Sequence, residues 1–232
     1  RQFGATFTPP AVVRSMVSWA QTQRKQFVRV VDPGAGSGRF ALAAARAFPN
    51  AEIVAVEKEP HIARLLNATV IAAGLQAQIR VLVQDYRTVD LPSVKGPTLF
   101  IGNPPYVRHH SIGPHWKRWY KAGLKAYDIS GSQLAGLHLH FLLKTRQVAR
   151  PGDYGCFITA AEWLDVNYGS PLRTMFTNGM GGQALHLIDK TTPVFDDALT
   201  SAVIFCFHVG GAKNSIRVRH VSSVNDLGDL SG

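Results

Sequence analysis

The stretch Phe27-Val28-Arg29-Val30-Val31-Asp32-Pro33-Gly34-Ala35-Gly36-Ser37-Gly38 decides the fold. Its apolar start predicts a buried parallel strand, and the apolar run 40–45 predicts a helix after it. The glycines permit positive φ and a close approach of backbone to a ligand, toward which the helix N-terminus would point. This order predicts an α/β fold with a ligand at the carboxyl end of the first strand. Arg39 stands where a dinucleotide-binding loop has glycine, which disfavours NAD and FAD.

Two further predicted strands end in polar residues at the same sheet edge. Residues 51–56 precede Glu57, and residues 79–83 precede Asp85 and Tyr86. Glu57 is placed to bind ribose hydroxyls. Asp85 could accept a hydrogen bond from an adenine amino group, and Tyr86 could pack on the adenine ring. Asp85 also has an alternative interpretation as a helix N-cap or turn residue.

The motif Asn103-Pro104-Pro105-Tyr106 directly follows the apolar run 98–102. A nitrogen conjugated with a ring or carbonyl is a poor nucleophile, and this motif suits its methylation. The Asn103 side-chain carbonyl can accept one amino hydrogen, and the backbone carbonyl of Pro104 can accept the other. Tyr106 offers a face for a flat base, an interaction worth roughly 1–3 kcal/mol. The alternative is a strand that ends in an ordinary proline-rich turn.

The formal charge of +10 is concentrated after this motif. The segment from Tyr106 to Arg150 holds eight Lys or Arg and one acid, Asp128, with tryptophans and tyrosines among them. Such a pattern is typical of a surface that binds phosphates and stacks bases. We expect a DNA-facing loop over residues 108–125, and the alternative is a solvated helical face. The candidate DNA-binding residues are Arg108, Lys117, Arg118, Lys121 and Lys125.

The order of these motifs resembles the gamma-class, TaqI-like, adenine-N6 DNA methyltransferases of restriction–modification systems. The resemblance also covers the Thr-Pro-Pro element at 8–10, the Pro-Gly strand at 151–159, and Val194-Phe195 with the apolar strand 201–205. One departure is His138, because the family usually has Asp-Leu-Tyr where this chain has Gly136-Leu137-His138.

The resemblance implies S-adenosylmethionine as the cofactor and assigns roles to individual residues. The implied cofactor-binding residues are Thr8, Asp32, Pro33, Gly34, Gly36, Gly38, Glu57, Asp85, Tyr86 and Asn103. The implied catalytic residues are Asn103, Pro104, Pro105, Tyr106 and Phe195, the last as a second wall for an extruded adenine.

The 232 residues, 46% of them apolar, fit one α/β domain with a sizeable core. We expect a Rossmann-like class I S-adenosylmethionine-dependent methyltransferase fold, a mostly parallel sheet with helices on both faces. Residues 1–95 would be the cofactor-binding half, residues 96–210 the catalytic half, and residues 211–232 the start of a linker to an absent target-recognition domain. Cys156 and Cys206 are expected to be core residues rather than a disulfide.

The sequence gives no sign of a membrane span, a signal peptide or a metal site. No apolar run is long enough for a membrane span and no signal peptide is visible, which favours the cytoplasm of a bacterium or archaeon. The histidine pairs 109/110 and 138/140 lack the company of a metal site, so no metal is expected.

We therefore expect methylation of a flipped adenine in DNA, in a restriction–modification or phage-defence system. DNA would be the partner, together with a separate or C-terminal target-recognition domain and a restriction endonuclease. The alternatives are an RNA adenine or protein glutamine methyltransferase, which share the Asn-Pro-Pro-Tyr motif, and a non-catalytic DNA-binding subunit of the same fold. The Thr-Pro-Pro and Val194-Phe195 elements count against the first two.

Overall fold

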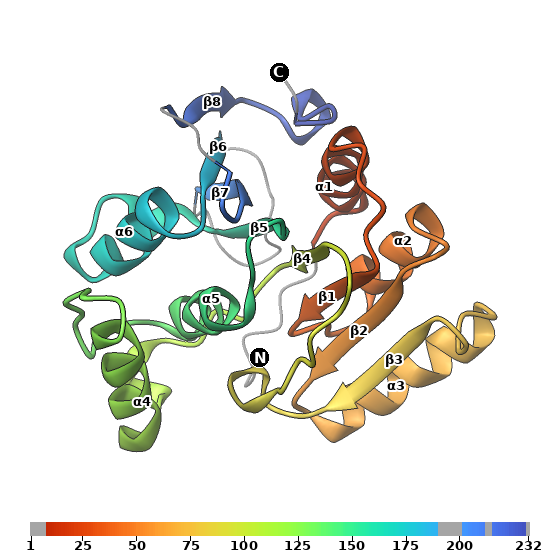
Figure 1. The fold of residues 1–232 in the computed structure, drawn as a ribbon, viewed down its shortest axis with the longest axis horizontal. Helices are drawn as coiled ribbons and strands as arrows, with labels where there is room; N and C mark the ends of the chain where they lie inside the picture. Colours follow the sequence, from red (N-terminus) through yellow and green to blue (C-terminus); the bar gives the residue numbers. More distant parts are fainter. Residues whose placement is uncertain (1–7, 190–200, 212–214, 231–232) are drawn as a thin grey trace.

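The computed structural model describes residues 8–189, 201–211 and 215–230, and within them a single twisted sheet lies between two groups of helices (Figure 1). The strands, in sheet order, are β3 (Ile79–Val83), β2 (Glu52–Glu57), β1 (Arg29–Pro33), β4 (Thr98–Gly102), β5 (Tyr154–Ala160), β7 (Ala202–His208), β6 (Gly182–Ile188) and β8 (Arg217–Val221). The helices are α1 (Pro10–Thr22), α2 (Arg39–Ala47), α3 (Pro60–Ala72), α4 (Pro114–Lys125), α5 (Leu137–Val148) and α6 (Ser170–Asn178).

The sheet is mostly parallel, as the sequence predicts. Strands β3, β2, β1, β4 and β5 pair in parallel, β7 runs antiparallel to both β5 and β6, and β8 is parallel to β6. The carboxyl ends of β1, β2, β3 and β4 therefore meet at one edge, which is where an open α/β sheet binds its ligand.

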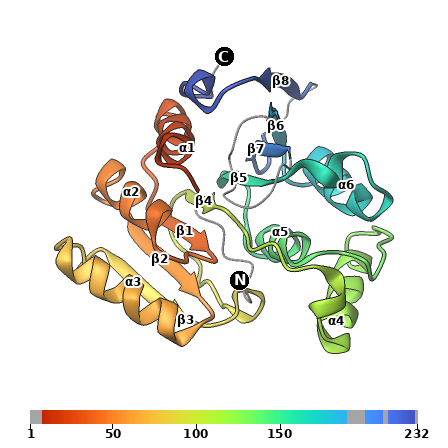
Figure 2. The ribbon, with the colours of Figure 1, turned by 180° about the vertical axis from the view of Figure 1, so that it is seen from behind.

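Each face of the sheet carries its own hydrophobic core. On one face the buried side chains of β1, β2 and β4 pack with those of α1, α2 and α3. On the other face they pack with α4, α5 and α6, and the reverse view separates the same two groups (Figure 2). The prediction of helices on both faces is confirmed, and β1 is buried along its whole length although it contains Arg29 and Asp32.

The two cysteines are both buried and free. Cys156 of β5 and Cys206 of β7 are register partners in the antiparallel pair, with 3.6 Å between their sulfur atoms. Their prediction as core residues is confirmed.

The prediction that residues 211–232 start a linker is wrong for their described part. Residues 217–221 form β8, and Leu227 and Leu230 are fully buried in the core that contains α1. Only Val221 of β8 is buried, and the other four residues are basic or partly exposed. This edge strand lacks the apolar alternation by which a strand is recognised.

No helix among the residues described is long and apolar enough to span a membrane.

Candidate functional site

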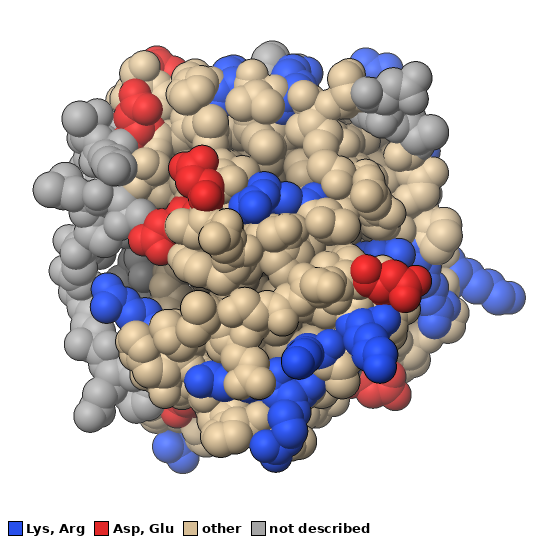
Figure 3. Space-filling view, turned by 90° about the vertical axis from the view of Figure 1, so that its left-hand side faces the viewer, with Lys and Arg blue, Asp and Glu red and all other residues tan. Residues whose placement is uncertain are grey.

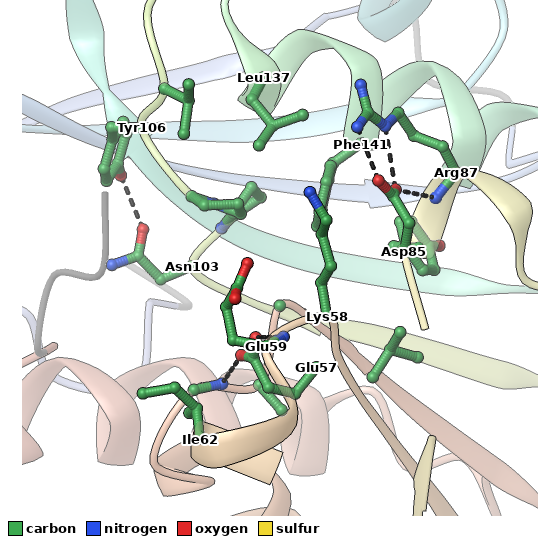
Figure 4. A pocket seen from close by; sticks show the side chains of 18 of the residues that line it. Glu57, Lys58, Glu59, Ile62, Asp85, Arg87, Asn103, Tyr106, Leu137 and Phe141 are labelled. Atoms are coloured by element: carbon green, nitrogen blue, oxygen red, sulfur yellow. Dashed lines mark hydrogen bonds and ion pairs between the residues drawn. The ribbon is translucent and has the colours of Figure 1, made fainter. Parts of the chain in front are cut away.

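A cavity of about 530 Å³ lies at the carboxyl ends of the central parallel strands (Figure 4). Its walls come from the glycine loop after β1, the ends of β2 and β3, the segment after β4, the start of α4, and α5. Seven of the predicted cofactor-binding residues line it: Thr8, Gly34, Gly36, Glu57, Asp85, Tyr86 and Asn103. Pro104, Pro105 and Tyr106 line it as well.

The glycine loop brings backbone directly against the proline motif. Gly34 has φ +72°, and a Cβ built on it would lie 3.0 Å from Cδ of Pro105. Gly36 has φ +52° and donates its backbone N–H to Oε2 of Glu57 at 2.9 Å. The other oxygen of Glu57 accepts from the N–H of Glu59 at 2.8 Å. Two backbone donors thus fix the carboxylate of Glu57 at the cavity wall.

Asp32, Pro33 and Gly38 are not among the residues that line the cavity, and their contact with a cofactor stays a prediction. Asp32 is only 1% exposed, and its Oδ2 accepts from the N–H of Ala41 at 3.0 Å, tying β1 to α2. Burial, together with the nearby charge of Glu57, raises the pKa of Asp32 to about 8 against the opposing Ala41 hydrogen bond. The carboxyl group of Asp32 is thus buried and bonded to the first turn of α2.

Asp85 and Tyr86 both lie at the end of β3 but face different surroundings. Asp85 caps the 3₁₀ helix η1 (Tyr86–Thr88) by accepting from the N–H of Arg87, so the N-cap interpretation of Asp85 is confirmed. Its carboxylate also forms two hydrogen bonds with the Arg87 guanidinium, at 2.9 and 2.6 Å. Hydrogen bonds and charge from Arg87 hold the pKa of Asp85 below its ordinary value, although burial alone would raise it.

Tyr86 contributes only an edge to the cavity, because it is 1% exposed. Its hydroxyl is bonded to Oγ1 of Thr145 at 3.1 Å, and its ring packs on Phe141 with centroids 5.2 Å apart. Burial raises the pKa of this phenol well above its ordinary value.

Asn103 has its side-chain amide held from both ends. Its Nδ2 donates to Oγ1 of Thr8 at 3.1 Å, and its Oδ1 accepts from the hydroxyl of Tyr106 at 2.7 Å (Figure 4). Thr8 is held in turn by Arg39, which donates to its carbonyl at 2.7 Å. The amide oxygen therefore faces Tyr106 and the amide nitrogen faces Thr8, an orientation that the sequence alone does not reveal. Burial also raises the pKa of Tyr106 well above its ordinary value.

The basic segment is a helix rather than the predicted loop over most of its length. Arg108 precedes a short 3₁₀ turn, and the other four predicted DNA-binding residues lie on α4. Lys117, Lys121 and Lys125 follow one another at four-residue spacing, so they share a stripe of the helix, and the buried Tyr120 and Leu124 lie beside this stripe. Figure 3 shows Lys and Arg gathered on the lower part of the face that α4 occupies.

Two histidines of α5 lie near these elements and face different neighbours. His138 lies 6.0 Å from the ring of Tyr106, and burial lowers its pKa to about 4. His140 stacks on Trp119 and Tyr120 of α4, at 5.9 and 4.5 Å. Within the described residues, no group of three or more His, Cys, Asp or Glu could hold a metal ion.

Phe195, the predicted second wall for an adenine, lies outside the described residues. Arg87 and Trp116 line the cavity and were not singled out as site residues by the sequence analysis. The signal available for Arg87 was its position two residues after a strand-end Asp.

The comparisons with known proteins agree with the geometry. Residues 86–195 match the family model described as Eco57I restriction-modification methylase. A solved structure from Listeria monocytogenes, assigned to the class I S-adenosylmethionine-dependent methyltransferases, superposes with a TM-score of 0.71 at 16% identity, covering 95% of this chain and 67% of that one. The chain has the class I methyltransferase fold.

Curated relatives extend the similarity in sequence. It is 51% identical over 228 residues to the type II methyltransferase M.XamI of Xanthomonas campestris pv. amaranthicola, covering 98% of this chain and 43% of the relative. It is 26% identical over 231 residues to the type II methyltransferase M.AccI of Acinetobacter calcoaceticus, covering 99% and 41%. A release factor glutamine methyltransferase of Mycolicibacterium smegmatis is 36% identical over 104 residues, covering 44% and 36%. The chain thus spans about two fifths of the length of the two type II relatives.

Proposed function

We propose that this chain is the catalytic part of an adenine-N6 DNA methyltransferase of a restriction–modification system, with S-adenosylmethionine as its cofactor. The observation that carries the proposal is that Asn103-Pro104-Pro105-Tyr106, at the end of β4, shares one cavity with Glu57 and Asp85. The 51% identity to a type II methyltransferase over nearly the whole chain supports it.

The residues of the cavity fit the cofactor. The glycine loop meets Pro105 so closely that a side chain at Gly34 would clash, which leaves bare backbone facing the cavity. Glu57, held by two backbone N–H groups, keeps lone pairs for ribose hydroxyls. Asp85, kept ionised by Arg87, can accept from the adenine amino group. When bound, S-adenosylmethionine supplies an electrophilic methyl group.

The orientation of Asn103 fits the proposed chemistry. Thr8 accepts from Nδ2 of Asn103, so the oxygen rather than the nitrogen faces Tyr106. A carbonyl oxygen has two lone pairs. Oδ1 can therefore keep the Tyr106 hydroxyl and accept one hydrogen of the target amine, while the Pro104 carbonyl accepts the other. These two acceptors would hold the amine in line with the methyl group, so that the N–C bond could form as the S–C bond breaks and S-adenosylhomocysteine leaves. The proton would pass to solvent after the transfer, so no general base would be needed.

The target base would leave the duplex to reach the cavity. Flipping costs a few kcal/mol, which stacking and hydrogen bonds in the pocket offset. We propose Tyr106 as one stacking face and Phe195 as the other. The stripe of Lys117, Lys121 and Lys125 on α4, with Arg118 and Arg108 beside it, would bind DNA phosphates.

The test is to incubate the purified protein with labelled S-adenosylmethionine and, separately, duplex DNA, structured RNA and a glutamine-bearing release factor. Label is expected in DNA, as N6-methyladenine after digestion to nucleosides, and Asn103→Ala should abolish it. Label in cytosine, or in RNA alone, would contradict the proposal. Absence of transfer, with DNA still bound, would indicate the non-catalytic subunit.

A second candidate function is N-methylation of a protein glutamine. The 36% identity over 104 residues to a release factor glutamine methyltransferase favours it, and the third arm of the assay decides it. For the first candidate, a target-recognition domain and a restriction endonuclease are the proposed protein partners.

A further inference from the structure

Arg87 connects the cofactor cavity to the basic helix α4. Its guanidinium is bidentate on Asp85, with Nε at 2.9 Å from Oδ1 and Nη2 at 2.6 Å from Oδ2. The guanidinium carbon also lies 3.7 Å from the centroid of the Trp116 ring, in the first turn of α4. One planar cation therefore touches both the strand-end carboxylate and the helix that carries the DNA-facing lysines.

These two contacts are what holds the Arg87 side chain. The residue is 6% exposed, and its remaining terminal nitrogen, Nη1, is buried without a hydrogen-bond partner among the described residues. Arginine is suited to this place, because its flat guanidinium can form a fork on a carboxylate and stack on an aromatic ring at the same time. Lysine has no flat fork, so it could not make both of these contacts at once.

The start of α4 also forms part of the cavity wall. Ile112, Gly113 and Trp116 line the same cavity as Glu57 and Asp85. On the next turn of α4, Trp119 and Tyr120 stack on His140, so α4 packs against α5. A shift of α4 on contact with DNA would move Trp116 and, through Arg87, the carboxylate of Asp85.

We propose that Arg87 is a positioning residue that orients Asp85 for the cofactor and, through its stack on Trp116, makes cofactor binding and DNA binding cooperative. The inference rests on the proposed function, since it takes the cavity as the cofactor site and α4 as the DNA-facing helix. It adds a physical connection between the cofactor cavity and α4, formed by the side chains of Asp85, Arg87 and Trp116.

The test is a binding cycle that uses S-adenosylhomocysteine, so that no turnover is needed. Its affinity is measured by calorimetry with and without saturating duplex DNA, and DNA affinity is measured with and without S-adenosylhomocysteine. Linkage requires the two ratios to be equal. The wild-type protein is expected to show a ratio of about 5 or more.

Four variants separate the contacts. Arg87→Met should weaken S-adenosylhomocysteine binding about 10- to 100-fold, as expected for loss of a charged hydrogen-bond partner, and should bring the ratio close to one. Trp116→Leu should lower the ratio while changing cofactor affinity in the absence of DNA much less, and Trp116→Phe should retain most of the ratio. Arg87→Lys keeps the charge and the stem, and it provides the measurement if Arg87→Met does not fold. Arg80→Met removes the exposed Arg80–Glu52 ion pair and is the matched control.

A wild-type ratio of one, or an unchanged ratio in both Arg87→Lys and Trp116→Leu, would overturn this inference while leaving methyl transfer to DNA intact. Failure of the wild-type protein to bind S-adenosylhomocysteine or to methylate DNA would instead overturn the proposed function.

Discussion

The orientation of the Asn103 side-chain amide determines which of its atoms is available for the proposed chemistry. Free rotation about its last bond would present oxygen and nitrogen equally often, and the nitrogen cannot accept a hydrogen. Thr8 and Tyr106 remove that ambiguity with one acceptor and one donor. The segment around Thr8 is thus a structural support for catalysis as well as part of the cavity wall.

Replacing Asn103 by Ala should remove methyl transfer and leave cofactor affinity nearly intact. Loss of one preorganised acceptor typically costs about 10²–10³ in rate. Single-turnover kinetics with calorimetry on the same preparation measures both quantities. Tyr106→Phe is the companion variant, because it removes the hydroxyl and keeps the stacking face, and its rate should lie well above that of Tyr106→Ala. Equal rates for wild type and Asn103→Ala would refute the mechanism.

The buried carboxyl of Asp32 should make stability depend on pH. Its pKa is raised to about 8 in the folded state, above the value of about 3.9 expected when unfolded. Between these values the folded state holds a proton that the unfolded state has lost, so the free energy of unfolding falls as pH rises. Asp32→Asn should therefore gain stability relative to wild type from pH 5 to pH 8, by a few kcal/mol at most. Urea unfolding at both pH values measures the gain, and the same difference at each pH would contradict the assignment.

At the scale of elements, α4 concentrates four cations on a helix whose other side is buried. Each phosphate contact contributes about −0.9 to the slope of log affinity against log salt. Lys121→Gln should therefore weaken DNA binding at low salt and make the slope shallower by about one. Lys95→Gln is the control. Lys95 is exposed in the loop at the amino end of β4, whereas the cavity lies at the carboxyl ends of the strands. Indistinguishable slopes for the two variants would exclude α4 from the interface.

The C-terminal strand should be needed for folding. Leu227 and Leu230 are fully buried beside α1, and β8 completes the pairing of β6. Leu227→Ala should cost about 2–5 kcal/mol of unfolding free energy, as for other buried leucines. Val218→Ala, at an exposed position of β8, is the control and should cost far less. Denaturant titration separates the two, and a neutral Leu227→Ala would restore the linker interpretation.

At the scale of the whole molecule, the cofactor-binding half could be predicted more fully than the rest. Strand β3 has the bounds that residues 79–83 predict. Beyond that half, β4 also has the bounds of the apolar run 98–102, because a parallel strand buried on both faces needs continuous apolar sequence. Helix α4 was missed because basic residues are interspersed with its apolar ones and only Tyr120 and Leu124 are buried, and β8 was missed because it is an edge strand with only one buried residue.

The sequence likewise predicts some features of the candidate site and not others. Motif residues such as Gly34 and Glu57 could be placed because strand ends fix their position. The burial of Asp32 could not be predicted, since the sequence does not show which way the side chain of a strand residue points. The contacts of Arg87 with Trp116 and of Asn103 with Thr8 join segments far apart in the chain, and no local pattern records them.

The facing thiols of Cys156 in β5 and Cys206 in β7 can also serve as a probe of unfolding. Burial raises the pKa of Cys156 well above its ordinary value, so the native protein presents almost no thiolate to a reagent. Both strands lie inside the sheet rather than at its edge. Reaction with a chromogenic disulfide should therefore require opening of the sheet, and its rate at moderate reagent concentration would report the population of opened molecules. The reaction rate of these thiols would therefore report global unfolding, and a bound ligand should lower that rate.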